Sequence, residues 1–481
     1  MKKYILFLIV FAYSLTSFAG KGKDGYKIKF KINGIKDTIV YLGHYYGDKK
    51  FAVDTSRVNS KGEGFFEGKK KLDGGIYFII MPSMHNTFFE VIIDKDQDFE
   101  LETDTTDFIS TMKIKGSEEN KVFNDYQQFM IKKSVESGKY RKALAKNRAN
   151  KDSTEFYKSK IDKINGEVQD YWANIEKKYP DLLIAKVVKS MEEIKIPDAN
   201  IDKNNPKKDS LEMAFKYHYY KTHYFDNIDF GDARMLRTPI FYNKLNTFVT
   251  RVVLQNPDTL IIEAHKMLKK AEADTNIFRY VLVYWLNYYE ESHLMGMDKL
   301  FVDIAENYYL KGKATWADST FLAKLADRVT KLKPNLVGNI APDLKLETPD
   351  GKYVRLLEIN SKYTVVIFWE PHCGHCKKAV PKLFKEFKED LKAKGVSVYA
   401  VYTQIELQPW TDFIEQHELT DENWHNVYDR FNFSNFRNLY DIYSTPTIYL
   451  LDKDKKIIAK RLDVEQIQKM VDRLEKDNKK K

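Results

Sequence analysis

The chain has 481 residues, of which 43% are hydrophobic, 31% charged and 14% aromatic; this is an ordinary globular composition, and at roughly 100–200 residues per domain it predicts two to four domains. The formal charge of +10 comes from 79 basic and 69 acidic residues that are interspersed along the chain. Because there is no arginine-rich stripe and no zinc-finger spacing, we expect no nucleic-acid partner.

Residues 1–19 have the three parts of a secretory signal peptide. Residues 1–3 are a short positive segment, residues 5–15 are apolar, and Ser17 and Ala19 supply small side chains at −3 and −1 for cleavage after Ala19. The apolar run is shorter than the roughly 20 residues that span a bilayer, and no cysteine follows it for a lipid anchor. We therefore expect a protein exported to the periplasm or cell envelope, with no transmembrane segment in the mature chain.

Residues 26–115 have the pattern of a small antiparallel β-sandwich. Polar and apolar side chains alternate in residues 27–32 and again in residues 99–103, which is typical of half-buried strands. Residues 76–81 and 88–93 are more apolar, and turn residues separate the runs. No catalytic constellation is visible in this region.

Residues 117–332 predict a helical domain, because glycine becomes scarce and apolar residues recur at helical spacing. Five aromatic residues cluster near its middle, which we interpret as core packing, with a partner groove as the alternative: Tyr217, Tyr219, Tyr220, Tyr224 and Phe225. Residues 333–338 are expected to form a linker. The helical segments are expected at about 153–178, 208–224, 240–254, 258–273, 276–290, 296–311 and 316–330.

Residues 337–481 predict an α/β domain. A hairpin is expected in residues 344–356, and the continuous apolar run 364–369 fits a buried central strand. The elements that follow alternate between helix and strand and end in a hairpin and a helix: helix 374–394, strand 396–402, a helix from Pro409, a short helix 435–440, strands 447–451 and 456–460, and helix 464–474. This order, βαβα and then ββα, is that of a thioredoxin fold.

The chain contains two cysteines, Cys373 and Cys376. An exported protein of this size could use many disulfides to stabilise its fold. A bridge between residues so close in sequence closes a very short loop and would add little stability. The pair is therefore interpreted as reactive rather than structural.

The expected position of the pair gives the two sulfurs different roles. A thiolate is the nucleophile, and an ordinary cysteine has a pKa near 8.5. Cys373 falls just after a strand and at the start of a helix, where unpaired N–H groups and about half a positive charge stabilise a thiolate. Cys376 lies one turn further on, close enough to attack a mixed disulfide. We therefore expect Cys373 to attack and Cys376 to resolve.

The surrounding residues resemble a known family. Residues 368–377, Phe-Trp-Glu-Pro-His-Cys-Gly-His-Cys-Lys, resemble the active site of the thioredoxin superfamily, and residues 337–343 resemble the opening segment of its TlpA-like and ResA-like bacterial envelope members. The region ahead resembles uncharacterised regions of exported proteins of the Bacteroidetes type. The resemblance implies protein disulfides as substrates and a membrane electron donor or acceptor, with no cofactor and no metal.

The two residues between the cysteines are expected to tune the redox potential. Gly374 lets the helix begin close to the sulfur, and His375 can stabilise the Cys373 thiolate by charge or by a hydrogen bond. The same dipeptide occurs in protein disulfide isomerase, whose potential is about −180 mV, against about −270 mV for thioredoxin. The pair is thus expected to lie towards the oxidising side, and the direction of electron flow stays open.

The resemblance also implies roles for residues outside the motif. Pro381 corresponds to a proline that kinks the first helix, and Pro446 to a cis-proline that faces the cysteines. Thr445, with its backbone exposed for pairing with a substrate strand, and Trp369 would contact substrate. One departure is that Ile367 occupies the place of a buried acid that accepts the proton of the resolving thiol.

The sequence leaves several candidates for the group that accepts the proton of the resolving thiol, Cys376. Glu370 is the nearest acid in sequence and could take over proton transfer, or it could be a solvated residue at a strand end, with water as the acceptor.

Other chemistries fit less well. A zinc site needs four ligands, and no second CxxC or HxxxH motif exists. Covalent haem attachment needs histidine directly after the second cysteine, where Lys377 stands. A peroxidase would place a single reactive cysteine in a different context. The alternative of another class is an envelope binding or scaffold protein, whose regions before residue 337 recognise a partner or a glycan.

Overall fold

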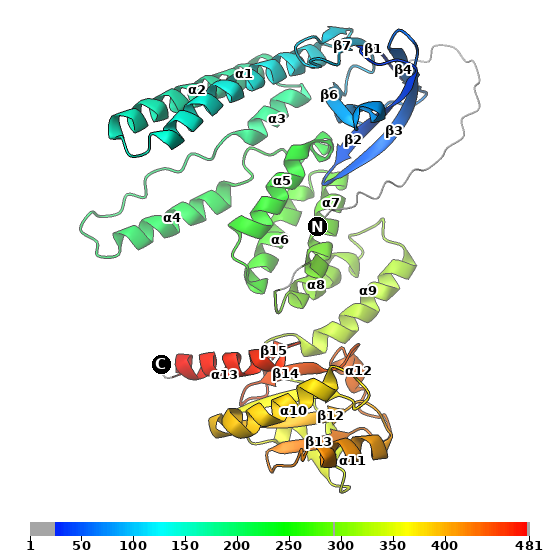
Figure 1. Ribbon diagram of the computed structural model, residues 1–481, viewed down its shortest axis with the longest axis vertical. Helices are drawn as coiled ribbons and strands as arrows, with labels where there is room; N and C mark the ends of the chain where they lie inside the picture. The colour runs from blue at the N-terminus through cyan, green and yellow to red at the C-terminus, as the bar shows by residue number, and fades with distance from the viewer. Residues whose placement is uncertain (1–24, 292–293, 479–481) are drawn as a thin grey trace. The chain divides into compact units, whose positions relative to one another are not determined.

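The computed structural model describes residues 25–291 and 294–478, so the expected signal peptide lies outside the described residues. The chain divides into two compact units, one ending at Phe248 and the other beginning at Val249 (Figure 1). The helices expected between residues 117 and 332 are shared between the two units. In the described part of the chain, no helix is long and apolar enough to cross a membrane.

The first unit begins with two four-stranded sheets that enclose one core. The first sheet has the order β4-β1-β7-β8, with β1 (Tyr26–Asn33), β4 (Glu63–Gly68), β7 (Asp98–Asp104) and β8 (Lys113–Lys115). The second has the order β3-β2-β5-β6, with β2 (Thr38–Tyr46), β3 (Lys49–Val58), β5 (Gly75–Met81) and β6 (Thr87–Ile93). The expected two-sheet arrangement is present, but β1 and β7 pair in parallel, so the first sheet is not purely antiparallel.

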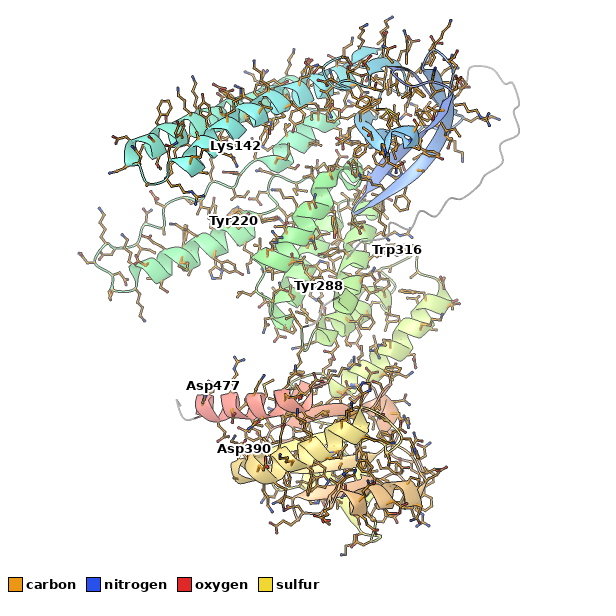
Figure 2. All side chains as sticks on the ribbon, in the orientation of Figure 1. Lys142, Tyr220, Tyr288, Trp316, Asp390 and Asp477 are labelled. Atoms are coloured by element: carbon orange, nitrogen blue, oxygen red, sulfur yellow. The ribbon has the colours of Figure 1, made fainter. Side chains whose placement is uncertain are left out.

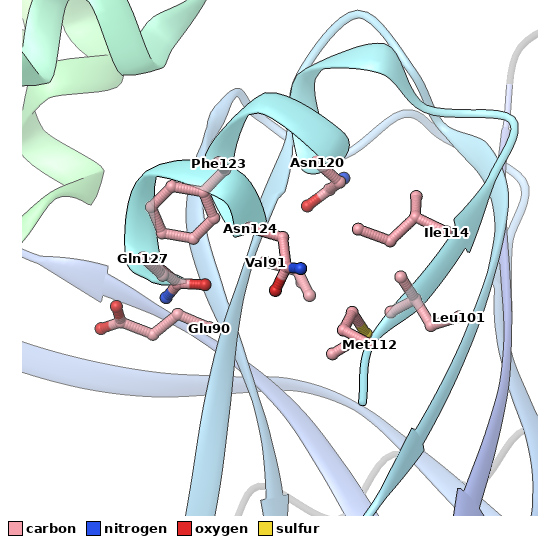
Figure 3. Close-up of a pocket in the computed structure, with 9 residues that line it drawn as sticks. All are labelled: Glu90, Val91, Leu101, Met112, Ile114, Asn120, Phe123, Asn124 and Gln127. Atoms are coloured by element: carbon pink, nitrogen blue, oxygen red, sulfur yellow. The ribbon is translucent and has the colours of Figure 1, made fainter. Parts of the chain in front are cut away.

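The start of α1 (Glu118–Lys146) closes the free edge of the second sheet. Ser117 caps the helix by accepting a hydrogen bond from the backbone N–H of Asn120. The Asn120 amide in turn pairs with both backbone groups of Ile92 on β6, donating to its carbonyl (2.6 Å) and accepting from its N–H (2.8 Å). The cavity beside this contact has a volume of about 10 Å³ (Figure 3), room for at most one water molecule.

The remaining helices of the first unit are α2 (Lys151–Lys178), α3 (Leu183–Met191), α4 (Lys208–His223) and α5 (Pro239–Thr247). α1 and α2 form a long hairpin (Figure 1), in which Phe129 stacks on Tyr171 at 4.0 Å. The aromatic cluster divides: Tyr224 and Phe225 are buried against Phe248, whereas Tyr220 on α4 (Figure 2) is 38% exposed.

The second unit contains a helical part and an α/β part. Its first helices are α6 (Pro257–Ala271), α7 (Thr275–Glu291), α8 (Asp298–Ile304) and α9 (Ser319–Leu332). Trp316, ahead of α9 (Figure 2), meets the Phe278 ring edge-on at 6.0 Å and carries the guanidinium of Arg279 over its face.

The α/β part is built on a seven-stranded sheet in the order β10-β9-β13-β12-β11-β14-β15. β11 is parallel to β12 and β12 to β13, whereas β14 and β15 run antiparallel to their neighbours. β13 lies inside the sheet although its sequence did not predict a strand. The strands are β9 (Lys345–Glu347), β10 (Tyr353–Arg355), β11 (Tyr363–Trp369), β12 (Val396–Tyr402), β13 (Trp424–Tyr428), β14 (Thr447–Leu451) and β15 (Ile457–Lys460).

Helices cover both faces of this sheet. One core contains side chains of α10 (Cys376–Glu386), α11 (Leu407–Gln416) and α13 (Val464–Asn478), and the other contains those of α12 (Phe436–Leu439). The apolar stripe of α10 continues past Pro381 through Leu383 to Phe387 and Leu391. Phe387 and Leu391 are the first and last residues of a π-helical turn. This is the thioredoxin-like α/β fold that the sequence predicts.

The expected linker 333–338 is packed rather than extended. Asn335 is fully buried and donates to the carbonyls of Lys331 (2.7 Å) and Leu439 (2.9 Å). Its own carbonyl and side-chain oxygen accept from the buried Lys460 ammonium on β15, which also pairs with Asp298 on α8. A buried, fully bonded asparagine holds this segment against the sheet, because leaving any of its polar atoms unpaired would be costly.

Candidate active site

Three loops meet at one edge of the seven-stranded sheet. In the register of the sheet, Trp369 at the end of β11 lies beside Tyr402 at the end of β12, and Thr447 at the start of β14 lies beside Phe368. The loops that follow β11 and β12 and the loop that precedes β14 therefore converge. They bring together Cys373, Gln404 and Thr445, which are far apart in the sequence.

The two cysteines are reduced and occupy different environments. Cys373 is partly exposed in the loop after β11, whereas Cys376 is the first residue of α10 and is fully buried. The backbone N–H of Cys376 donates to Cys373 Sγ (3.3 Å), and the Cys373 thiol donates to the carbonyl of Thr445 (3.1 Å). The helix N-terminus thus points an N–H group at the outer sulfur, as the sequence predicts.

These environments separate the acidities of the two thiols. For Cys373, partial burial alone would raise the pKa, but hydrogen bonds from Cys376, from the Thr445 side chain and from the backbone of Cys376 and His375 outweigh it and lower the pKa. For Cys376, burial and the hydrogen bond to Cys373 raise the pKa to about 12. Cys373 is therefore the better nucleophile, and Cys376 holds its proton.

Two residues, Gly374 and His375, lie between the cysteines. His375 is exposed, and it is the His375 backbone that contributes to the low pKa of Cys373. A Cβ added at Gly374 would meet open space, and Gly374 is not in the left-handed region. The structure therefore gives no steric reason for glycine at this position.

Trp369 is a correction to the sequence interpretation. Its side chain is 0% exposed and packs on Phe413 (5.1 Å between ring centroids) and Tyr402 (6.4 Å). As the last residue of a strand buried on both faces, it points into the core beneath the cysteines. The buried Trp369 side chain packs in the same core as Cys376 and is not placed to contact substrate.

The loop before β14 provides the opposite wall of the site. The Thr445–Pro446 peptide bond is cis, and both residues are partly exposed beside Cys373. Further along α10, Pro381 lies inside the helix and is partly exposed. Both prolines stand where the resemblance implies them.

Glu370 is tied into the site by two loops. Its Oε2 accepts from the Gln404 side chain (2.6 Å), and its Oε1 accepts from the Thr445 hydroxyl (3.3 Å). Ile367, at the usual place of an acid, is fully buried among apolar side chains. Gln404 has no sequence signal, because its partner lies in a different loop.

Among residues 25–291 and 294–478, no group of three or more histidine, cysteine, aspartate or glutamate side chains could hold a metal ion.

Comparisons with known proteins match three segments of the chain. Residues 336–477 match the Redoxin family, residues 208–335 a domain of unknown function (DUF5106), and residues 26–123 another (DUF4369). A domain of a possible thiol-disulfide isomerase from Cytophaga hutchinsonii has a solved structure that is 38% identical, covers 30% of this chain and 97% of its own, and has a TM-score of 0.28.

Two curated relatives are named thiol-disulfide oxidoreductase ResA. The Bacillus subtilis protein is 26% identical over 121 residues, which is 25% of this chain and 64% of that protein's length. The Geobacillus thermodenitrificans protein is 30% identical over 134 residues, which is 27% of this chain and 74% of the relative. With the Redoxin match and the thioredoxin-like fold, the chain belongs to the ResA-like thiol-disulfide oxidoreductase family, carrying DUF4369 and DUF5106 ahead of its redox domain.

Proposed function

We propose that this protein is an exported thiol–disulfide oxidoreductase that acts on protein disulfides through Cys373 and Cys376. The observation that carries the proposal is the contrast between the two thiols. Cys373 is partly exposed with a lowered pKa, and Cys376 is buried with a raised one. An accessible thiolate beside a protonated reserve thiol is what a two-step exchange requires.

In the first step the Cys373 thiolate attacks one sulfur of a substrate disulfide, and the other substrate sulfur leaves as a thiolate. In the second step Cys376 loses its proton and attacks Cys373 Sγ, which releases the substrate thiolate and closes the Cys373–Cys376 disulfide. The protein is thereby oxidised by two electrons and the substrate reduced by two. The same steps in reverse would oxidise a substrate dithiol.

Substrate binding is assigned to the loop before β14. The Thr445 carbonyl lies 3.1 Å from Cys373 Sγ, so a peptide that reaches this sulfur must pass alongside that backbone. An extended peptide can pair with exposed backbone groups there in the manner of an added strand. We also propose that the protein works in the periplasm or cell envelope and that a membrane protein is its electron donor or acceptor.

An insulin-reduction assay with dithiothreitol tests the activity. Wild-type protein should accelerate insulin precipitation, and Cys373→Ser should fall to the rate of dithiothreitol alone, because the attacking sulfur is gone. Cys376→Ser should instead trap a mixed disulfide with insulin, visible on a non-reducing gel. Equal rates for wild type and Cys373→Ser would refute the proposed function.

The standard reduction potential of the Cys373–Cys376 pair distinguishes the direction of the reaction. A value near −270 mV would fit a reductase fed by a membrane donor, and one near −180 mV or above would fit isomerase or oxidase work. A lowered Cys373 pKa stabilises the reduced form, which favours the more oxidising value. Equilibration with glutathione buffers measures it.

A further inference from the structure

The segment that matches DUF5106 contacts the redox domain next to its active site. α9 is the last α-helix of that segment, and the Redoxin match begins only at residue 336. Arg328 on α9 donates from Nη1 to Asp441 Oδ1 (2.5 Å) and to the Tyr443 hydroxyl (3.1 Å). Asp441 and Tyr443 lie in the stretch between α12 and β14 that also contains Thr445. A residue from outside the redox domain therefore holds the chain that leads into the substrate loop.

The contact between α9 and this stretch is anchored by buried groups. The Asp441 side chain is 1% exposed, and its second oxygen accepts from Arg461 Nη2 (2.7 Å). Just past α9, the buried Asn335 donates to the carbonyl of Leu439 at the end of α12 (2.9 Å). Hydrogen bonds that are shielded from water are electrostatically stronger than exposed ones, so α9 and residues 439–443 are held in one arrangement.

Tyr443 is fixed by Arg328 and faces solvent. The Arg328 guanidinium lies over the Tyr443 ring, 5.2 Å from its centroid, in addition to the hydrogen bond to the hydroxyl. Tyr443 is nevertheless 68% exposed. An aromatic side chain that is already ordered loses little entropy when a partner binds, so most of its contact energy is available for binding. These are the properties of a recognition residue rather than of core packing.

Tyr443 lies within reach of a substrate that is bound at Cys373. It precedes Thr445 by two residues, so the Cα atoms of the two are at most about 7 Å apart. The Thr445 carbonyl in turn lies 3.1 Å from Cys373 Sγ. A peptide that pairs with the Thr445 backbone advances by about 3.3 Å per residue. The substrate side chain two residues from the reacting cysteine is therefore the one that comes level with Tyr443.

We propose that Tyr443, positioned by Arg328 of the DUF5106 segment, is a specificity-determining residue that favours an aromatic substrate side chain two residues from the reacting cysteine. The inference rests on the proposed function, because it concerns the choice of substrate at the same site. Tyr443 touches the substrate, whereas Arg328 is a positioning residue that acts through Tyr443. An aromatic partner is assigned because two aromatic rings attract one another by more than the area that they bury.

Three synthetic peptides, each with a single cysteine in a mixed disulfide with thionitrobenzoate, test this contact. Phenylalanine stands two residues before the cysteine in the first peptide and two residues after it in the second, and serine stands at both places in the third. The Cys373 thiolate attacks the peptide sulfur, the disulfide bond breaks, and the coloured thionitrobenzoate leaves as a thiolate. Cys376 then loses its proton and attacks Cys373 Sγ, which releases the peptide thiolate and leaves the protein oxidised by two electrons.

The second-order rate constant of colour release is measured for each peptide with reduced protein. We expect the wild-type protein to prefer one of the phenylalanine peptides over the serine peptide by about three- to tenfold, the factor that an aromatic pair contributes. Parallel pairing with the Thr445 backbone would select the first peptide, and antiparallel pairing the second.

Variants are compared by the ratio of the rate constants for the preferred phenylalanine peptide and the serine peptide. Tyr443→Ala should bring this ratio to about one. Arg328→Met should lower it at least about twofold, because the ring is no longer held before the substrate binds. Arg461 remains as a partner of Asp441 in Arg328→Met, so the buried carboxylate stays paired. In Tyr443→Ala the further change Arg328→Met should not alter the ratio, since Arg328 acts through Tyr443.

Two matched controls should keep the wild-type ratio. Lys324→Met removes an exposed cation one turn earlier on α9, and Tyr353→Ala removes an exposed tyrosine on β10.

Equal rate constants for the three peptides with the wild-type protein would overturn the inference and leave the proposed function standing. An unchanged ratio in Tyr443→Ala would overturn it as well. If Arg328→Met slowed all three peptides by the same factor, Arg328 would only support the loop, and its assigned role would be wrong. Colour release by the wild-type protein no faster than by Cys373→Ser would refute the proposed function itself.

Discussion

The clearest quantitative consequence of the site is that alkylation should distinguish the two cysteines. The thiolate is the reactive form. A thiol with a pKa of about 12 is ionised in about one molecule in 10⁵ at pH 7, because each pH unit below the pKa is a factor of ten. An ordinary thiol is ionised by a few per cent, and the pKa of Cys373 lies below the ordinary value.

The ratio of thiolate fractions is therefore at least about 10³ in favour of Cys373 at pH 7. Full burial of Cys376 adds to this difference by excluding the reagent. Reduced protein treated briefly with iodoacetamide should carry the label on Cys373 alone when its peptides are analysed by mass spectrometry. The rate of labelling should reach half its maximum at a lower pH than for an unperturbed cysteine, because the pKa of Cys373 is lowered.

Variants make this prediction refutable. The Cys376→Ser variant should carry the label on Cys373, as the wild-type protein does. The Cys373→Ser variant should scarcely be labelled until the protein is denatured. Comparable labelling of both cysteines in the native protein would show that the burial and hydrogen bonding described for Cys376 do not govern its acidity.

Three further predictions concern stability, each measured by urea unfolding of the full chain. Lys460→Met should destabilise the second unit by about 3–5 kcal/mol, because it leaves the buried Asp298 carboxylate unpaired; Lys333→Met, in an exposed pair, should cost at most about 1 kcal/mol. Asn120→Ala should cost about 1–3 kcal/mol by leaving both backbone groups of Ile92 on β6 unpaired, and no loss would contradict the edge contact. Burial raises the pKa of Glu119 to about 7, so its stabilising contribution is complete below pH 4.5 and is lost as pH rises through 7; Glu119→Gln should remove that dependence.

The features that local sequence specifies were predictable. The apolar run of β11 and the stripe of α10 have a period that follows directly from their secondary structure, and the cysteines sit at the junction between them. β13 was missed because its buried residues include polar ones. Trp424 donates from its indole N–H to Asn426, whose amide donates to the carbonyl of Leu419, so a polar pair is satisfied inside the sheet. These hydrogen bonds allow polar side chains to lie in a buried strand, so hydrophobic periodicity alone does not reveal it.

The parts of the site that depend on tertiary structure were not predictable. Trp369 belongs to the motif, yet its exposure is decided by the helix packed beneath it. The contact between Glu370 and Gln404 joins residues from two loops, and neither has a neighbour in sequence that signals it. A motif specifies what its own backbone positions, and it says little about side chains that arrive from other strands.

The chemistry of the cysteine pair depends on the register of the sheet as well as on the motif. The N–H group that contacts Cys373 comes from the next turn of its own chain, so it survives wherever the motif folds. The Thr445 carbonyl, in contrast, reaches Cys373 Sγ because β14 pairs with β11 so that Thr447 lies beside Phe368. A shift of that pairing by one residue would turn alternate side chains of β14 to the opposite face and move the Thr445 carbonyl away from Cys373. The attacking thiol thus has one contact fixed by its own helix, the Cys376 N–H, and one fixed by strand pairing, the Thr445 carbonyl, and the two can be changed independently.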